Sequence, residues 1–265
     1  MNEIQIYIEQ IECFPGKEVP IADLTHELYE LCFMLEGNGD YYVESAVYSL
    51  RPGDLILTKK TENHFAQVPE KESYKFLSVR FPETYFGGNA WPEMLAFLDS
   101  RPLGQFNLYP AAQFKNTNWK YYLQQLYDHR DSPTLTKVYL SVLLAELMEA
   151  YSSISQPSHQ RSDQLFAIIS YINSHLAEPM SVEGLCQRFF ISRSHLNRLF
   201  RKMTGASVWD YVVAKRLIYA KILLEAGETP AVACQKAGFN DYSPFYRAYR
   251  ARYGVSPRLH KQKKS

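Results

Sequence analysis

Two segments in the C-terminal half carry hydrogen-bonding and basic side chains at helical spacing, "CQRFFISRSHLNRLFR" (186–201) and "CQKAGFNDYSPFYRAYR" (234–250). Their polar residues recur at i, i+3, i+4 and i+7, which places them on one face of a helix. The two faces consist of Ser194, Asn197, Arg198 and Arg201, and of Ser243, Tyr246, Arg247 and Arg250. Such side chains can hydrogen-bond base edges and bind phosphates from inside a DNA major groove. The alternative is a solvated polar face, but its repetition in a basic segment favours contact with DNA.

The two segments are copies of one unit. After one inserted residue near Asn240 they align, with the matched pairs Cys186–Cys234, Gln187–Gln235, Leu196–Phe245, Arg198–Arg247 and Arg201–Arg250. Each copy is typical of a helix-turn-helix, because a capping residue precedes a short helix, a tight turn follows, and a second cap begins another helix. The caps are Ser181 and Ser192 in the first copy, and Thr229 and Asp241 in the second.

The stretch "SVWDYVVAKRLIYAKILLEA" (207–226) separates the copies and contains no Gly or Pro. It predicts one unbroken helix, about 30 Å long at 1.5 Å per residue. One turn of B-DNA is about 34 Å long. A rod of this length can therefore hold two recognition helices in successive major grooves on one side of a duplex.

Charge divides the chain into two halves. Residues 1–151 contain 12 Lys+Arg and 21 Asp+Glu, a net charge of −9, whereas residues 152–265 contain 17 and 7, a net charge of +10. A basic half predicts a polyanionic partner, while the acidic half has another task. The polar stretch "YSSISQPSHQRSD" (151–163) is typical of a linker between the two halves.

Several classes of protein are disfavoured. The N-terminus "MNEIQIYIEQ" lacks the basic and apolar regions of a signal peptide, and no run of about 18 apolar residues occurs. The four cysteines are scattered, with no C-x-x-C pair. We expect reduced thiols, a cytoplasmic location and no membrane association.

The acidic half changes its periodicity at about residue 113. Residues 4–82 alternate in hydropathy between the turn signals "EGNGD" and "RPGD", which predicts a β-barrel or sandwich. Residues 113–150 predict two amphipathic helices. One carries an apolar stripe of Leu140, Leu143, Leu144 and Leu147. This stripe can pack on the barrel or on a second copy of the chain, and we expect a homodimer.

The stretch "GFNDYSPFYRAYRARYGVSP" (238–257), with Ala233 ahead of it, resembles the signature of the AraC/XylS transcription regulators. The resemblance covers about residues 163–260 and implies a seven-helix DNA-binding unit. It implies base-reading positions at Ser194, Asn197 and Arg198, and at Tyr242, Ser243 and Arg247. We add Arg193, Arg201 and Arg250 as further DNA-contacting candidates. Pro244 departs from the family pattern and is expected to bias Ser243 away from α geometry.

The stretches "THELYELCFMLEGNGDYYV" and "YSLRPGDLILTKKTENHFAQV" resemble the small cupin barrel of many such regulators. Cupin enzymes bind a metal through histidines and a glutamate, which would fall here on His26, Glu30 and His64. The usual fourth ligand is missing, because Leu24 stands at its position. We expect no metal and no cofactor. The candidate effector-binding residues are His26, Glu30, Met34, Tyr42 and His64.

These observations predict an α+β multidomain chain: a cupin-like effector-binding barrel (1–110), a helical dimerisation pair (111–151), a linker (152–162) and an all-α unit with two helix-turn-helix motifs (163–265). The expected function is ligand-responsive, sequence-specific DNA binding without enzymatic activity. The family implies an activator of sugar or related metabolite genes, with double-stranded DNA, RNA polymerase and a small molecule as partners. The alternatives are a cupin metalloenzyme fused to a DNA-binding module and a ligand-free architectural DNA binder.

Overall fold

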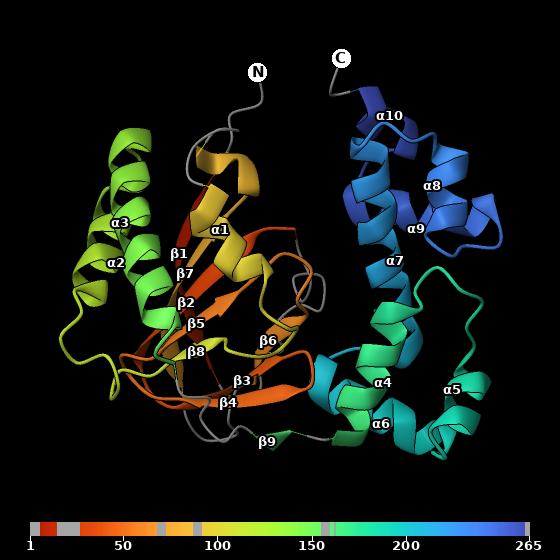
Figure 1. Cartoon of the computed structure of the whole chain (residues 1–265), viewed down its shortest axis with the longest axis horizontal. Coiled ribbons are helices and arrows are strands. Elements are labelled where there is room, and N and C mark those ends of the chain that lie inside the picture. The colour runs from red at the N-terminus through yellow and green to blue at the C-terminus, as the bar shows by residue number, and fades with distance from the viewer. Residues whose placement is uncertain are drawn as a thin grey trace. The chain divides into compact units, whose positions relative to one another are not determined.

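The computed structural model describes residues 6–14, 27–67, 73–86, 92–154, 160–161 and 163–262. The chain divides into two compact units, Met1–Arg161 and Ser162–Ser265. Strands with flanking helices make up the first unit and helices alone the second, as Figure 1 shows. This is the α+β arrangement that the sequence predicts. Within the described ranges, no helix combines the length and apolar character that crossing a membrane requires.

The first unit contains two antiparallel sheets, with the strand orders β1-β7-β2-β5-β8 and β6-β3-β4-β9. The strands are β1 (Tyr7–Cys13), β2 (Tyr29–Glu36), β3 (Gly39–Val43), β4 (Ala46–Leu50), β5 (Leu55–Thr58), β6 (His64–Gln67), β7 (Tyr74–Phe81), β8 (Leu108–Tyr109) and β9 (Gln160–Arg161). Alternation along β2 sends Cys32 and Met34 to one buried cluster and Leu31 and Phe33 to another. The sheet therefore has an apolar core on each side.

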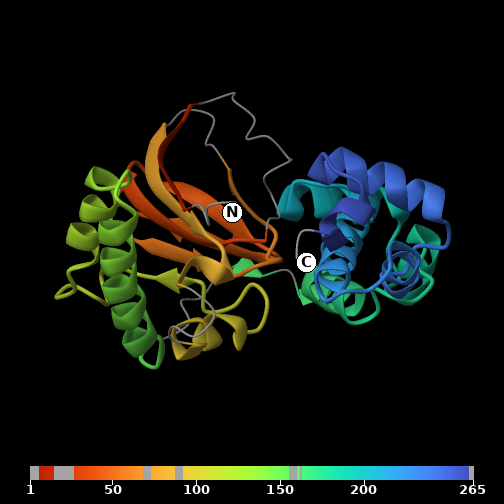
Figure 2. The same cartoon turned by 90° about the horizontal axis from the view of Figure 1, so that it is seen from above.

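Helices cover the core that contains Leu31 and Phe33. The 3₁₀ helix η2 (Glu83–Phe86), α1 (Pro92–Asp99), α2 (Trp119–Asp128) and α3 (Pro133–Tyr151) follow the main strands. Figures 1 and 2 show α2 and α3 side by side at the outer face of the five-stranded sheet. Ser132 caps α3 by accepting a hydrogen bond from the Leu135 N–H, and Pro133 begins the helix, where its missing N–H is harmless.

The apolar stripe of α3 belongs to this core. Leu140, Leu143, Leu144 and Leu147 are all 0 % exposed and pack with residues of α2 and the five-stranded sheet. The dimerisation role that we predicted for them is therefore wrong, since the domain already buries their side chains. Of the two alternatives, packing on the barrel is the one that the structure adopts.

The segment predicted as a linker contains a short strand. Gln160 and Arg161 form β9, which pairs antiparallel with Val47 and Ala46 of β4. β9 is thus the fourth strand of the second sheet, and the chain adds it only after α3. A polar, proline-containing sequence gives no sign of this pairing, because the partner strand lies more than 100 residues earlier.

The second unit contains seven helices in its described residues: α4 (Asp163–Ser174), α5 (Val182–Arg188), α6 (Arg193–Thr204), α7 (Val208–Glu225), α8 (Pro230–Lys236), α9 (Tyr242–Tyr253) and α10 (Pro257–Gln262). Ser181, Ser192, Ser207 and Thr229 each cap a helix through a side-chain oxygen that accepts a backbone hydrogen bond. Gly205 and Gly254 end α6 and α9 in the left-handed conformation.

The two helix-turn-helix copies also share their backbone conformation. The Ile191 N–H donates to the Cys186 carbonyl and the Phe239 N–H to the Cys234 carbonyl, both at 3.1 Å. The residue before each of these donors has a positive φ, 51° at Phe190 and 85° at Gly238. The turns of the two helix-turn-helix motifs are therefore the same turn, built once with glycine and once with phenylalanine.

Candidate nucleic-acid interface and ligand cavity

The helix α7 is the rod that carries both motifs. It runs unbroken over 18 residues from its Ser207 cap, a length of about 27 Å. Leu217, Ala220 and Leu224 on α7 pack with Phe245 and Tyr249 of α9. In Figure 1, α6 lies toward the N-terminal end of α7 and α9 toward its C-terminal half. One continuous helix thus separates the two candidate recognition helices.

The helix α6 has one buried and one polar face. Leu196 and Phe200 are 0 % exposed. The opposite side carries the candidate residues, all exposed except the half-buried Asn197: Arg193, Ser194, Asn197, Arg198 and Arg201. Arg193 donates to Glu183 of α5 at 2.9 Å, in a pair so exposed that it contributes at most about 1 kcal/mol. This pair can open at little cost when a phosphate approaches.

The helix α9 repeats this division. Phe245 and Tyr249 are 0 % exposed, while Tyr242, Ser243, Arg247 and Arg250 are exposed. The Tyr242 ring lies edge-on to Phe245 at 5.7 Å, which anchors it at the start of the helix. Pro244 occupies the first turn, where helical N–H groups need no partner within the helix, and Ser243 is helical. The expected distortion at Ser243 is therefore absent.

The two faces present free positive charge. Within the described part of the chain, Arg198, Arg201, Arg247 and Arg250 make no ion pair with an acidic side chain. Arginine fits base edges and phosphates through its planar fork of donors. The arrangement can therefore bind a polyanion without first breaking strong contacts within the protein.

The first unit encloses an apolar interior between its two sheets. Cys13, Cys32, Met34, Tyr41, Tyr48, Tyr74 and Phe76 belong to the buried cluster there. The gap lined by Cys32, Met34, Tyr41, Tyr74, Phe76 and their neighbours is closed, without room for a water molecule. Aromatic rings and sulfur atoms dominate this lining. A ligand with an apolar body would suit this lining if the side chains moved apart.

Hydrogen-bonding groups gather next to this interior. The carboxylate of Glu30 accepts from Ser78 Oγ at 2.5 Å and contacts His64 Nε2 at 2.8 Å. His64 Nδ1 lies 2.8 Å from the Glu62 carbonyl oxygen. Burial alone would lower the pKa of His64, but the hydrogen bond and charge of Glu30 raise it above its ordinary value.

The predicted effector-binding residues divide in the structure. Glu30, Met34 and His64 lie at or beside the interior, while His26 falls outside the described residues. Tyr42 lies elsewhere, because it stacks on Phe65 at 4.7 Å on the opposite face of β3 from Tyr41. On β3 the residue that faces the interior is Tyr41, which was not among the predicted effector-binding residues.

The described residues do not bring together enough side chains to coordinate a metal ion. Glu30 and His64 hydrogen-bond to each other, and the described residues contain no group of three or more His, Cys, Asp or Glu that could hold an ion. The ligand set that the cupin resemblance implies is therefore incomplete in this part of the chain.

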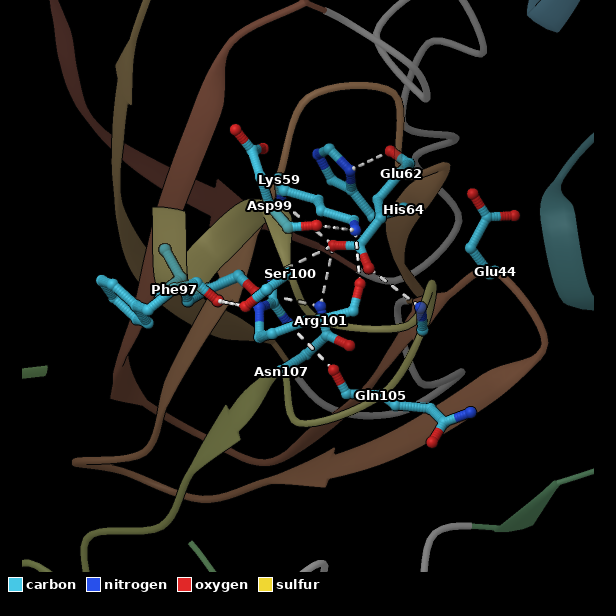
Figure 3. A network of polar contacts seen from close by, with 12 residues as sticks. Glu44, Lys59, Glu62, His64, Phe97, Asp99, Ser100, Arg101, Gln105 and Asn107 are labelled. Carbon is cyan, nitrogen blue, oxygen red and sulfur yellow. Dashed lines mark hydrogen bonds and ion pairs between the residues drawn. The ribbon is translucent and has the colours of Figure 1, made fainter. Parts of the chain in front are cut away.

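A second buried polar network was not predicted. Glu62 is 0 % exposed and accepts hydrogen bonds from the Lys59 N–H, the Gly104 N–H and Asn107 Nδ2, each at 2.9 Å. Arg101, also buried, approaches Glu62 at 3.4 Å (Figure 3). Lys59 Nζ donates to the Arg101 carbonyl. The network joins the β5–β6 turn to the segment before β8, and no sequence spacing links these two positions.

The contact between His64 and Glu30 predicts that the free energy of unfolding depends on pH. Because the folded pKa is raised, the stabilisation is fully present below the unfolded pKa of about 6.5 and is lost as pH rises through the folded value. His64→Gln should therefore cost about 1.5–3 kcal/mol near pH 5.5 and less near pH 8.5. Urea unfolding of both proteins at each pH measures the difference. Glu30 and Glu62 face the ring, and an equal cost at both pH values would contradict this account.

Comparisons with known proteins match both units. The AraC-like ligand binding domain matches residues 12–104, and a helix-turn-helix domain matches residues 185–263. The HTH-type transcriptional activators RhaS of Citrobacter koseri and of Salmonella schwarzengrund are each 20% identical over 271 residues, which cover 95% of either chain.

Solved structures also resemble the chain. Apo ToxT K231A from Vibrio cholerae is 13% identical, with 98% of each chain covered and a TM-score of 0.43. The DNA-binding domain of AdpA, in complex with a target DNA, is 27% identical, with 38% of this chain and 93% of that chain covered and a TM-score of 0.37.

Proposed function

The chain belongs to the AraC/XylS family of transcription regulators, and from this premise we propose that it activates transcription by reading two successive major grooves under the control of a small molecule. The observation that carries the proposal is the pair of like faces on α6 and α9, held by one unbroken helix. Residues 1–110 would bind the effector, 111–151 would support dimerisation, and 163–265 would bind DNA.

The proposed readers of base edges are Ser194, Asn197 and Arg198 of α6, and Tyr242, Ser243 and Arg247 of α9. Residues in the first half of a recognition helix meet base edges, whereas its end lies nearer the backbone. Arg201 and Arg250 stand in the last turns of their helices and are therefore proposed to bind phosphate.

The test is selection of duplexes from a randomised library by the full chain, followed by footprinting of the selected sequence. We expect two protected major-groove segments whose centres are about 10 base pairs apart on one side of the DNA. A single protected segment, or protection without sequence preference, would reject the proposal.

The effector is proposed to bind in the interior lined by Met34, Tyr41 and Tyr74, after the side chains that fill this interior move apart, with its polar group toward Glu30 and His64. The lining consists mainly of aromatic rings and sulfur atoms, with hydroxyl groups on Tyr41 and Tyr74, so a molecule with an apolar body and a polar end fits it better than a sugar does. Thermal unfolding against a panel of aromatic acids, phenols and sugars separates these classes. A ligand that binds only the folded state raises the midpoint.

Activation is proposed because the related RhaS proteins are named transcriptional activators. Its readout is transcription in vitro by RNA polymerase from a promoter that carries the selected sequence. Transcript yield should rise when the protein is added, and a fall would make the protein a repressor.

Dimerisation is proposed through a stripe that the domain leaves exposed. Leu135, Val138 and Val142 are 36–51 % exposed and lie at i, i+3 and i+7 on α3, and Tyr121 of the neighbouring α2 is 56 % exposed. Exposed apolar side chains that recur along one helix face can mark a protein interface. Closed two-fold pairs bring the same stripe of both copies together.

Val138→Asp should weaken this dimer by about 2 kcal/mol, which raises its dissociation constant about 30-fold, because each copy would bury an unpaired charge. Sedimentation equilibrium measures the constant. Lys115→Asp, on an exposed residue outside the stripe, is the control and should leave the constant unchanged. Equal effects of the two substitutions would place the interface elsewhere.

A further inference from the structure

Arg216 is a buried cation near the middle of α7. Its side chain is 4 % exposed, and its guanidinium donates to two backbone carbonyl oxygens, Leu176 at 2.9 Å and Glu178 at 2.8 Å. Both carbonyls follow the C-terminal end of α4, where a positive charge is favourable. Within the described residues, Arg216 has no acidic partner. Its hydrogen bonds are thus directed at the backbone before α5.

Gly238 packs against the same contact. It stands in the turn of the second motif with φ +85°, a conformation that favours glycine. A Cβ added there would collide with the Leu176 carbonyl oxygen and would lie 2.9 Å from Arg216 Nε. The turn can approach this closely only because residue 238 has no side chain.

Three segments therefore meet at one point, which we call the Arg216 junction and define as Arg216, Leu176 and Gly238. Leu176 lies before the first helix-turn-helix, Arg216 lies on the rod, and Gly238 lies four residues before α9. We propose that the Arg216 junction fixes α9 relative to α6, so that both recognition helices fit successive grooves of one duplex. This inference rests on the proposed two-groove DNA binding.

The first copy lacks such a contact. Phe190 occupies the equivalent turn position with φ +51°, yet its side chain is 95 % exposed. Phe190 and Gly238 share the same backbone turn. They differ in the residues that pack against them. Phe190 is therefore the matched control for Gly238.

The junction acts through effective concentration. When one recognition helix is bound, a rigid link presents the other to its groove at high effective concentration. If the Arg216 junction is disrupted, this effective concentration falls while each recognition helix stays unchanged. Affinity for a duplex with both half-sites should fall, while affinity for a duplex with one half-site should not.

The experiment uses the full chain with Arg216→Met, Gly238→Ala and the control Phe190→Ala. The probes are the duplex selected by the wild-type protein and two derivatives, each with one half scrambled. Arg216→Met and Gly238→Ala should bind the intact duplex about tenfold more weakly or worse, and each derivative within about twofold of wild type. Phe190→Ala should change none of the three affinities. Equal losses on all three duplexes, or no loss on the intact one, would overturn the proposal.

A second measurement does not depend on DNA. Spin labels at Lys202→Cys and Ala251→Cys, both at exposed positions of α6 and α9, report the distance between the helices in a Cys186→Ser background. The distance distribution should broaden in Arg216→Met and Gly238→Ala and stay narrow in Phe190→Ala. An unchanged distribution in the first two overturns the junction even if the protein binds DNA as proposed. A broadened one supports it even if no selective duplex is found.

Discussion

Replacing Arg101 with Met should lower the free energy of unfolding of the first unit by about 3–5 kcal/mol. Arg101 is 1 % exposed and lies against the carboxylate of Glu62, which is 0 % exposed. Removal of the cation leaves a buried anion whose desolvation is only partly offset by the hydrogen bonds from Gly104 and Asn107. Calorimetry of the full chain follows the transition of this unit, because the two units need not unfold together.

The control for this prediction is the pair of Lys60 and Glu83. Their separation is only 2.6 Å, but both side chains are partly exposed. Lys60→Ala should therefore cost less than about 1 kcal/mol. The double variant Arg101→Met with Glu62→Leu should be more stable than Arg101→Met alone, since it removes the unpaired charge. A cost for Lys60→Ala as large as that for Arg101→Met would show that burial does not decide the effect.

The DNA-binding unit was predictable because its signals are local. Caps at Ser181, Ser192 and Thr229 and the helical spacing of buried and polar residues each act within a few residues of the chain. The turn of the first copy contains Phe190, whose residue type does not indicate a positive φ. The same hydrogen-bonded turn that Gly238 forms gives Phe190 its positive φ. The alignment of the two copies therefore predicts the turn at Phe190, although phenylalanine itself does not indicate one.

The first unit was predictable only to the level of its sheets. Alternation shows that β3 has two faces, but it does not say which face is inward, and an error of one residue exchanges Tyr41 for Tyr42. The leucines of α3 show the same limit. Their spacing predicts a buried stripe, whereas the partner that covers it depends on tertiary packing. The Glu62–Arg101 contact joins residues 39 apart, and no periodicity predicts it.

Arg198→Ala and Arg250→Ala should weaken DNA binding in different ways. Arg198 lies in the first half of α6, with Leu196 and Phe200 buried on the other side, so it points away from the core, and we propose that it meets base edges. Its loss should cost about 1–3 kcal/mol and relax the preference at one base pair. Arg250 lies in the last turn of α9. Its loss should weaken all sequences alike and reduce the salt slope by about 1.

Binding to the selected duplex and to single-base variants of it, over a series of salt concentrations, separates the two effects. Arg258→Ala removes one exposed cation from α10, outside both faces, and should change affinity less than either substitution does. If it weakens binding as much as Arg250→Ala, the contribution of Arg250 is general charge and not a phosphate contact. If Arg198 and Arg250 lose specificity equally, position along the recognition helix does not divide base reading from backbone binding. The faces of α6 and α9 would then share one role, and the resemblance of the two copies would extend from their backbone to their chemistry.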